Sequence, residues 1–449
     1  MMANTLDPNR SRIGFLSGDG IPDSNMVADL SLTEDGIIVR VPWNHSSRPE
    51  YERWFGDGIQ WGDDPEKTKF KYNPPQQIDF QDSNGRIVLS GCHSRGSKRN
   101  PISRIGTGII GVDYAILGAT SAENYSSING FRSEIEGLGT WMNLSSLSIK
   151  HTSDADGRLR TVEMKLESPE EVRVHRNLNL KVVPSFQYDR GPRPDETVIN
   201  ERMYVESLVK RSRSWDEHLN LHIKMRDLLR LSSWRQLNFL SHKATREDDP
   251  LRTLDGAGHG RVWYEVHTFR TKVAENPSEG SVNFLFSYSD LSKSGISTWI
   301  KLHDSMARGI DPIISLLDLE NGTINSAFAQ IGIGLEALGY LIAIEKGVSK
   351  KKAGDQTFEN RLQNIWNDIK TQPPTDGTRW IRDTTKLYNS VKHANRTAPM
   401  PKDLRENFWR SVLIFRFWIA GRLGVSSKTI HKAARIDQIA QAVKHFDSP

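Results

Sequence analysis

The chain has 449 residues, of which 37% are hydrophobic and 26% are charged, which is typical of a soluble globular protein of two or three domains. Its single cysteine, Cys92, excludes an internal disulfide framework and a zinc site built from several cysteines. The apolar run "SVLIFRFWIAG" (411–421) is interrupted by Arg416 and too short to cross a bilayer, and the N-terminal residues lack the apolar core of a signal peptide, so we expect a cytoplasmic protein without a membrane-spanning helix.

The net charge of +5 is distributed unevenly along the chain. From Leu341 to the end there are 20 Lys and Arg against 10 Asp and Glu, so this part carries +10 and the first 340 residues carry −5. A basic C-terminal part favours a polyanionic partner. Ordinary surface composition explains the same balance about as well.

The first 200 residues predict an antiparallel β-sandwich or barrel. Three short segments rich in strand-forming residues follow turn signals, and a fourth segment alternates apolar and polar side chains. These segments are "GIIVRVPW" (36–43), "GRIVLSGC" (85–92), "LRTVEMKLES" (159–168) and "NLNLKVVPSFQY" (177–188). We take residues 1–200 as a β-rich N-terminal domain.

Residues 201–296 mix both kinds of element and continue the N-terminal region. Residues 214–234 have helical periodicity, and three later segments are rich in strand formers. Those segments are "RQLNFLSHK" (235–243), "RVWYEVHTFR" (261–270) and "SVNFLFSYS" (281–289).

Residues 297–449 predict a helical bundle of five or more helices, which makes the whole chain an α+β multidomain protein. The first helix is expected to stop before Pro312, where a second short helix starts. The others are expected at 324–347, which is nearly all apolar, at 356–370, from Trp380 to near Pro399, at 402–424 and at 428–446.

Three patterns that resemble binding motifs have plainer explanations. "GTGIIG" (106–111) matches a dinucleotide-binding string, but a strand-like segment follows it instead of a helix, so hairpin glycines are the better interpretation. His218 and His222 could share a metal on one helix face, but no third ligand is placed nearby, which favours satisfied or solvent-facing histidines. The basic loop "CHSRGSKRN" (92–100) is interpreted as a solvated turn. We therefore expect no cofactor and no metal site.

Glu336 lies in the apolar helix "IGIGLEALGYLI", with apolar residues on both sides. A buried carboxylate without a partner costs several kcal/mol, so such a group is normally paired or hydrogen-bonded. We expect donors from the Arg, Lys, Asn and His side chains of the later helix that contains residues 387–396, unless Glu336 lies on a narrow exposed stripe.

The segment "LYNSVKHANR" (387–396) places polar groups at helical spacing. At about 100° per residue, four polar residues share one stripe and four less polar residues occupy the opposite face. The stripe consists of Arg382, Asn389, His393 and Arg396, and the opposite face of Trp380, Leu387, Val391 and Ala394.

The stripe contains the groups that metal-independent RNA cleavage requires. A histidine side chain can take and return a proton near neutral pH, an amide can orient a phosphate or the imidazole, and a guanidinium can neutralise charge on the phosphorane. In that reaction the ribose 2′-OH attacks the neighbouring phosphate. A solvated polar face is the alternative interpretation.

The combination of "LEAL" on a long apolar helix with "YNSVKHANR" on a later one resembles the HEPN family, in particular its ApeA-like branch. In that branch a β-rich region precedes the HEPN domain, and "GLGTWMNLSSL" and "HLNLHIKMRDLLRLSSW" are similar to segments of that region. The resemblance implies an all-α bundle that dimerises with two motif helices facing one another. It also implies metal-independent ribonuclease activity in defence against phage, including abortive infection.

The family motif has an Arg, often followed by Asn, shortly before a His. Asn389 and His393 match it, but Tyr388 stands where the Arg is expected. Loss of one charge-stabilising donor is worth roughly 10²- to 10³-fold in rate, so this departure bears on activity more than on the fold. The candidate substitutes and supporting residues are Arg396, which has the best spacing, and Arg382, Lys386, Lys392 and Glu336.

These features predict a cytoplasmic homodimer that cleaves host or phage RNA, with tRNA as a possible substrate. His393 would transfer the proton, and Asn389 would orient the His393 imidazole or the phosphate. The β-rich region would sense an unknown phage-derived trigger. Two alternatives stay open. The bundle could bind RNA or a protein as a catalytically impaired sensor or scaffold, or the β-rich region could bind a ligand while the bundle only dimerises.

Overall fold

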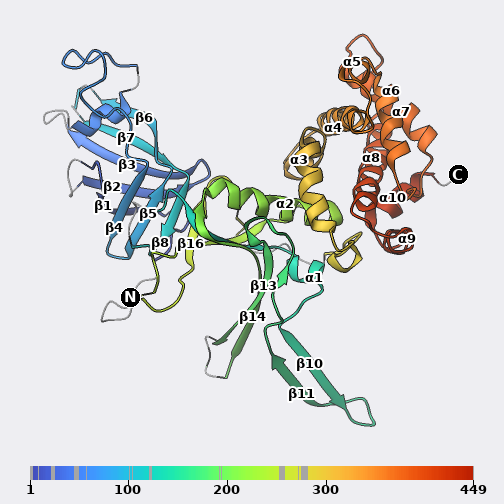
Figure 1. The fold of residues 1–449 in the computed structure, drawn as a ribbon, viewed down its shortest axis with the longest axis horizontal. Coiled ribbons are helices and arrows are strands. Elements are labelled where there is room, and N and C mark those ends of the chain that lie inside the picture. The colour runs from blue at the N-terminus through green and yellow to red at the C-terminus, as the bar shows by residue number, and fades with distance from the viewer. Residues whose placement is uncertain are drawn as a thin grey trace.

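Strands fill the N-terminal part of the chain and helices fill the C-terminal part (Figure 1). The last described strand ends at Thr268, and helices occupy most of the chain from Gly295 to Asp447. This order confirms the predicted α+β class. The computed structural model describes residues 4–8, 10–21, 26–44, 50–56, 58–100, 102–103, 105–120, 124–191, 193, 195–251, 258–271, 273–274 and 282–447.

The described strands form one large antiparallel sheet and one separate hairpin. The sheet has 14 strands in the order β12-β13-β14-β9-β15-β16-β8-β5-β4-β1-β2-β3-β7-β6, and β10 pairs only with β11. The strands from β1 to β8 are Arg12–Ser17, Met26–Thr33, Gly36–Asn44, Gln77–Asp82, Gly85–Ser90, His93–Asn100, Ile105–Val112 and Tyr114–Leu117. Those from β9 to β16 are Ile128–Ile135, Leu147–Ser153, Leu159–Leu166, Val172–Arg173, Lys181–Arg190, Thr197–Arg213, Phe239–Thr245 and Tyr264–Thr268.

The glycines of "GTGIIG" lie within strand β7 and are required by aromatic packing. The rings of Trp43 and Phe55 stack with their centroids 5.6 Å apart. A Cβ atom at Gly106 would collide with the Trp43 ring, and one at Gly108 with the Phe55 ring. The string therefore packs a core and neither forms a hairpin turn nor precedes a helix. The neighbouring basic segment, predicted to be a turn, forms the edge strand β6.

Helix α2 (Trp215–Ser233) joins the sheet to the helical bundle (Figure 1). It begins at a capping box, in which the Ser214 side chain accepts from the Glu217 backbone N–H and Glu217 reaches back to Ser214. It ends at Trp234, whose left-handed conformation (φ 51°) terminates the helix. Its side chains contribute both to a small core against β9 and to the large core shared with the bundle. The short helix α1 (Leu138–Met142) packs against β14.

A buried chain of hydrogen bonds holds α2 against the sheet. Ser207 Oγ lies 2.6 Å from His218 Nδ1 and 3.0 Å from His222 Nε2, and Ser133 Oγ lies 2.8 Å from His222 Nδ1. The chain continues from Ser133 to His242 Nδ1, again at 2.8 Å. The two α2 histidines therefore hydrogen-bond to serines of the sheet through His218 Nδ1 and both ring nitrogens of His222, and both are buried rather than solvent-facing.

Acidification is expected to destabilise the fold through these histidines. Burial lowers the pKa of His218 to about 4 and that of His242 to about 3, and it holds the pKa of His222 well below its ordinary value. Below pH 6.5 the unfolded chain therefore binds more protons than the folded one, and stability falls by up to about 1.4 kcal/mol per pH unit for each histidine. We expect denaturant titrations at pH 7, 6 and 5 to show this fall. The free energy of unfolding of the His242→Gln variant should fall less steeply with falling pH. Parallel pH profiles for wild type and variant would show that His242 does not contribute to the loss of stability.

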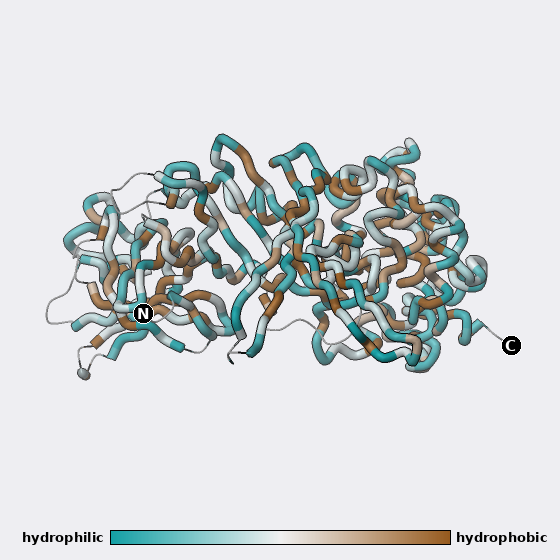
Figure 2. The backbone as a smooth tube through the Cα atoms, turned by 90° about the horizontal axis from the view of Figure 1, so that it is seen from below, coloured by the Kyte–Doolittle hydropathy of each residue, from teal (hydrophilic) through white to brown (hydrophobic). Residues whose placement is uncertain are grey.

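The bundle is built around α4 (Ile324–Glu345), with α3 (Gly295–Ile314), α6 (Phe358–Asp368), α7 (Gly377–Lys392) and α8 (Pro401–Arg422) against it. Its glycines allow close approach, because a Cβ at Gly334, Gly339 or Gly332 would collide with α3, α6 or α7. Figure 2 shows hydrophobic and hydrophilic stretches alternating along this part of the chain, as expected for packed amphipathic helices. The remaining helices are α5 (Lys350–Gly354), α9 (Ser427–Ala434) and α10 (Gln438–Asp447).

Helix α4 is long and apolar enough to cross a membrane by length and composition alone. Half of its most apolar 18-residue stretch is buried inside the protein, and Phe328, Ile331, Leu335 and Leu338 are fully buried. It is therefore a core helix of the bundle.

The buried Arg416 of α8 fastens the end of α2 to the start of α10. Its guanidinium donates to the carbonyls of Leu231 (2.9 Å) and Ser232 (2.6 Å) and to both carboxylate oxygens of Asp437 (3.0 and 2.8 Å). Asp437 in turn accepts from the backbone N–H groups of Ile439 and Ala440, which caps α10. We call this arrangement the Arg416 clasp.

Several predicted elements differ from the structure. Residues 282–287 form no strand, because Phe286 packs into the core and its carbonyl accepts from the Trp141 indole. Pro312 lies inside the last turn of α3 and does not end the helix, although it lacks the N–H for one i→i−4 hydrogen bond, and only the short 3₁₀ helix at Ser315–Asp318 follows. The predicted helix at 428–446 breaks before the Asp437 cap. The predicted boundaries at 200 and 296 fall inside β14 and α3, and the division into 1–200, 201–296 and 297–449 stays a prediction.

Candidate functional site

The candidate site lies at the C-terminal end of α7. The helix begins at Asp376, whose carboxylate accepts from the backbone N–H groups of Thr378 (2.9 Å) and Arg379 (3.2 Å). It ends at Lys392, well before Pro399, because His393 adopts an extended conformation (φ −118°, ψ 110°). The segment that follows contains Asn and Thr, which favour helices weakly, and Pro399 disfavours helix at the preceding residue.

This early end changes the predicted stripe. Arg382, Lys386 and Asn389 share a face of α7, but His393 and Arg396 lie beyond the helix, so helical spacing does not determine where their side chains point. The backbone N–H of Arg396 donates to the His393 carbonyl at 3.0 Å, which forms a turn. Ala394, predicted to face the core, is exposed. The prediction of one continuous helical stripe was therefore wrong.

A groove of about 790 Å³ runs between α7, the turn after it and α8. We call it the α7–α8 groove. Of the predicted site residues, Lys386 and Arg396 line it, while Asn389 and His393 do not. The lining side chains with charge are Arg379, Asp383, Lys386, Arg396, Asp403, Glu406 and Arg410.

Ion pairs engage part of the positive charge in and around this groove. The buried Arg410 pairs with Asp447 at 2.8 Å, and Arg379 lies 3.6 Å from Asp383. Arg382 pairs with the same Asp383 carboxylate at 2.9 Å, so its charge is partly compensated. Among the residues that the structure describes, no carboxylate forms an ion pair with Lys386 or Arg396. These two cations are therefore the ones best placed to meet an anion.

Tyr388, which stands where the HEPN resemblance expects an Arg, is buried and points away from solvent. It is 5% exposed, and its hydroxyl donates to Glu336 Oε2 at 3.3 Å. Burial and the Glu336 carboxylate raise the pKa of Tyr388 to about 12, so the phenol stays protonated as a donor. Lys392 lies over its ring, 5.6 Å from the centroid. Tyr388 thus supports the helix and presents no group to a substrate.

Glu336 is paired, although not with the basic side chains that the sequence predicted. Its other carboxylate oxygen accepts from Arg361 of α6 at 2.8 Å, so the partners are Arg361 and Tyr388. Glu336 is partly exposed, whereas the Arg361 side chain is 14% exposed. Neither Asn389 nor His393 has a described hydrogen bond to Glu336.

Glu336→Ala is expected to lower the free energy of unfolding by about 1–3 kcal/mol, because it leaves the Arg361 guanidinium and the Tyr388 hydroxyl without their shared acceptor. Chemical denaturation measures the change. Glu359→Ala is the matched control, because Glu359 is exposed on the neighbouring helix α6. Equal effects of the two substitutions would show that the carboxylate contributes nothing at this position.

Sequence reasoning missed three arginines near the site, namely Arg361, Arg379 and Arg410. A signal was available for Arg410, because an arginine within the largely apolar helix α8 requires a buried partner. No signal identified Arg361, whose pairing depends on how α4 and α6 pack. Within the described ranges, no group of three or more His, Cys, Asp or Glu side chains is arranged to hold a metal ion.

Comparison with known protein families identifies the family of the N-terminal region. The model of the family described as ApeA N-terminal domain 1 matches residues 11–299, which is more than half of the chain. The chain belongs to the ApeA-like family of anti-phage defence proteins. Comparisons of this ApeA-like protein with curated proteins and with solved structures found no match.

The family match covers the sheet, α2 and the first turn of α3. It ends before Glu336 and before the α7–α8 groove, so it carries no information about the candidate site.

Proposed function

We propose that this ApeA-like protein is a metal-independent endoribonuclease whose C-terminal helices form a HEPN domain. His393 transfers the proton between the attacking ribose 2′-OH and the leaving group. Arg396 and Lys386 bind the phosphate and offset its charge, and Asn389 orients the phosphate or the imidazole. The substrate is host or phage RNA, with tRNA as one candidate.

The observation that carries this proposal is the arrangement at the end of α7. His393 and Arg396 are exposed three residues apart in one turn, and Arg396 and Lys386 line the groove beside it without a described ion-pair partner. A turn that carries both an exposed histidine and an arginine without a described ion-pair partner suits an RNA backbone, which presents a phosphate at each step. Arg396 is favoured over Arg382 as the substitute for the missing motif Arg, because Arg382 already forms an ion pair with Asp383.

A second candidate function is RNA binding without cleavage, with the protein as a sensor or scaffold. It is favoured by Tyr388, since the residue at the motif Arg position lies buried against Glu336. In this case Lys386 and Arg396 still bind RNA, but charge on the phosphorane is too weakly stabilised for turnover.

Three further features belong to the same proposal. Two copies pair through their bundles, so that the two α7 ends face one another across the RNA. The β-rich region recognises a phage-derived trigger and restrains or releases the bundle. The protein acts in the cytoplasm, where both the trigger and the RNA are present.

The full chain, incubated with total cellular RNA and tRNA in the presence of EDTA, tests the two candidates together. Cleavage in EDTA supports the ribonuclease. Binding of the same RNA without cleavage, measured by gel shift in parallel, supports the second candidate. Absence of both would overturn the assignment of an RNA-binding site to α7.

A further inference from the structure

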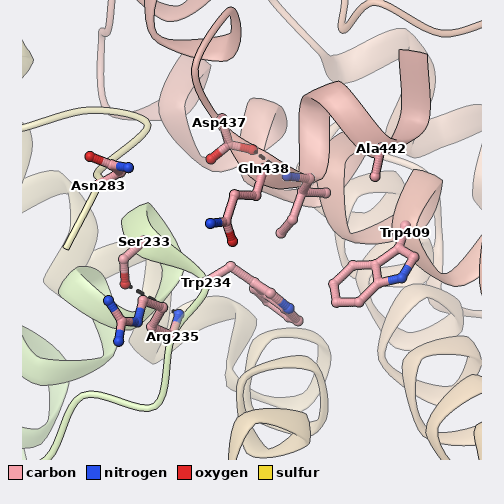
Figure 3. A pocket seen from close by; sticks show the side chains of 9 residues that line it. Ser233, Trp234, Arg235, Asn283, Trp409, Asp437, Gln438 and Ala442 are labelled. Atoms are coloured by element: carbon pink, nitrogen blue, oxygen red, sulfur yellow. Dashed lines mark hydrogen bonds between the residues drawn. The ribbon is translucent and has the colours of Figure 1, made fainter. Parts of the chain in front are cut away.

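A pocket of about 580 Å³ lies where the end of α2 meets α8 and α10, and its buried polar groups are already bonded (Figure 3). Asp437 accepts on both carboxylate oxygens from the buried Arg416, and the Ser233 hydroxyl donates to the Leu229 carbonyl at 2.9 Å. Among the described residues that line this pocket, none has a buried side-chain atom without a hydrogen-bond partner. The α7–α8 groove differs in this respect.

The α8 wall of the α7–α8 groove contains a buried amide whose oxygen has no partner. Asn407 lines the groove and is 4% exposed. Its Nδ2 donates to the backbone carbonyl of Asp403, one turn earlier in α8, at 3.1 Å. Its Oδ1 is buried and accepts no hydrogen bond from any residue that the structure describes. Buried acceptors are normally bonded, and one without a donor costs free energy, so this oxygen suits a donor that a ligand brings.

The Asp403 side chain adds a second acceptor to the same wall. Asp403 is exposed and lines the groove, and within the described ranges no cation forms an ion pair with it. Because it precedes Asn407 by four residues, the two side chains are neighbours on one face of α8. Glu406, the other carboxylate of this wall, lies 3.5 Å from Arg410 and 3.9 Å from Lys402. The acceptors best placed for a ligand are therefore Asp403 and Asn407.

The groove as a whole suits a ligand that has an anionic group and an edge of hydrogen-bond donors. Lys386 and Arg396 face it from α7 and the following turn, and its volume of about 790 Å³ is within the usual range for small-molecule sites. A nucleotide within RNA has a phosphate and a base edge. Guanine has two adjacent donors, N1–H and N2–H, with no acceptor between them. Uracil has its N3–H between two carbonyl oxygens, which a carboxylate repels.

We propose that the α7–α8 groove selects guanine in single-stranded RNA, with the base donating to Asp403 and Asn407 from N1–H and N2–H. Lys386 and Arg396 hold the phosphate of the same nucleotide. This inference rests on the proposed function, since it takes RNA as the ligand of the groove, and it adds the base that is recognised. Asp403 and Asn407 are then specificity-determining residues, and a cut made at the end of α7 falls beside a guanine.

The test measures binding of the full chain to short 2′-O-methyl oligonucleotides by fluorescence anisotropy. Methylation removes the attacking 2′-OH, so the probes are not cleaved by the proposed reaction. Each probe is a run of uridines with one central guanine, inosine, adenine, cytosine or uridine. The guanine probe should bind about tenfold more tightly than the all-uridine probe. Inosine lacks the N2 amino group and should lose most of this advantage.

Substitutions on α8 should remove the preference for guanine. Asn407→Leu, checked for folding by its thermal midpoint, removes the unpartnered oxygen at similar volume, so the ratio of guanine to uridine affinity should fall about tenfold while the all-uridine probe binds as before. Asp403→Ala, at an exposed position, should lower the same ratio. Asn367→Leu is the matched control, because Asn367 is exposed on α6 and does not line the groove.

Equal binding of all five probes would overturn the inference, and so would a guanine preference that Asn407→Leu and Asp403→Ala both leave intact. Lys386→Ala separates these results from a failure of the proposed function, because loss of a phosphate contact should weaken binding to every probe by the same factor. If no probe binds, or if Lys386→Ala changes nothing, the groove is not an RNA site, and the proposed function is overturned together with the guanine selection.

Discussion

His393→Ala is expected to lower the rate of RNA cleavage by about 10²- to 10⁴-fold, the usual contribution of general acid–base catalysis. His393 is exposed and follows the last residue of α7, so its removal leaves the helix, the Glu336 pairing and the Arg416 clasp in place. RNA binding should change little, because the phosphate contacts are assigned to Lys386 and Arg396. The measurement is a single-turnover cleavage rate beside a binding titration on the same RNA.

The matched control for this prediction is His445→Ala, which removes another exposed histidine from the bundle, in α10. It should cleave at the wild-type rate. A His393→Ala protein with wild-type activity would exclude His393 as the proton-transfer group. Loss of binding and cleavage in equal measure would instead assign His393 to RNA binding.

Asp437→Ala is expected to lower the free energy of unfolding by about 3–5 kcal/mol. The substitution leaves the fully buried Arg416 guanidinium without its counter-charge, and removing one partner of a buried ion pair is among the most destabilising single changes. It also removes the cap of α10. Denaturant-induced unfolding of the variant and wild type measures the difference.

Two controls separate the contributions at this position. Asp437→Asn keeps an acceptor for the α10 backbone but loses the charge, so its effect should be smaller than that of Asp437→Ala and should report mainly on Arg416. Asp355→Ala, at an exposed aspartate, should change stability by no more than about 0.5 kcal/mol. If Asp437→Ala changed stability no more than Asp355→Ala, the clasp would have no role in holding α2 to the bundle.

Much of the fold could be predicted from local pattern. The strands at Gly36–Asn44 and Gly85–Ser90 and the helices α2 and α4 lie where alternation, turn residues and helical periodicity indicated them. The predictions were wrong where tertiary contacts determine the local structure. Residues 282–287 have strand-forming side chains but use them to fill the core, and the last helix breaks because Asp437 pairs with an arginine from another helix.

The sequence predicted a candidate site near the end of α7, but the geometry of that region could not be predicted. The spacing of Asn389, His393 and Arg396 identified the region, and extrapolating the helix beyond Lys392 gave the wrong face for Ala394. The partners of Glu336 lie on two other helices, so only the packing of α4, α6 and α7 reveals that Tyr388 points inward. The pocket lined by Trp234, Trp409 and Gln438 has no sequence signature, since its walls come from four separate segments between residues 233 and 442.

The chemical ends of the RNA products formed by the wild-type chain in EDTA test the central claim most directly. Attack by the ribose 2′-OH, as proposed for His393, predicts fragments that end in a 2′,3′-cyclic phosphate or a 3′-phosphate and begin with a 5′-hydroxyl. Fragments with a 3′-hydroxyl and a 5′-phosphate, or cleavage that EDTA abolishes, would contradict a metal-independent ribonuclease at the end of α7.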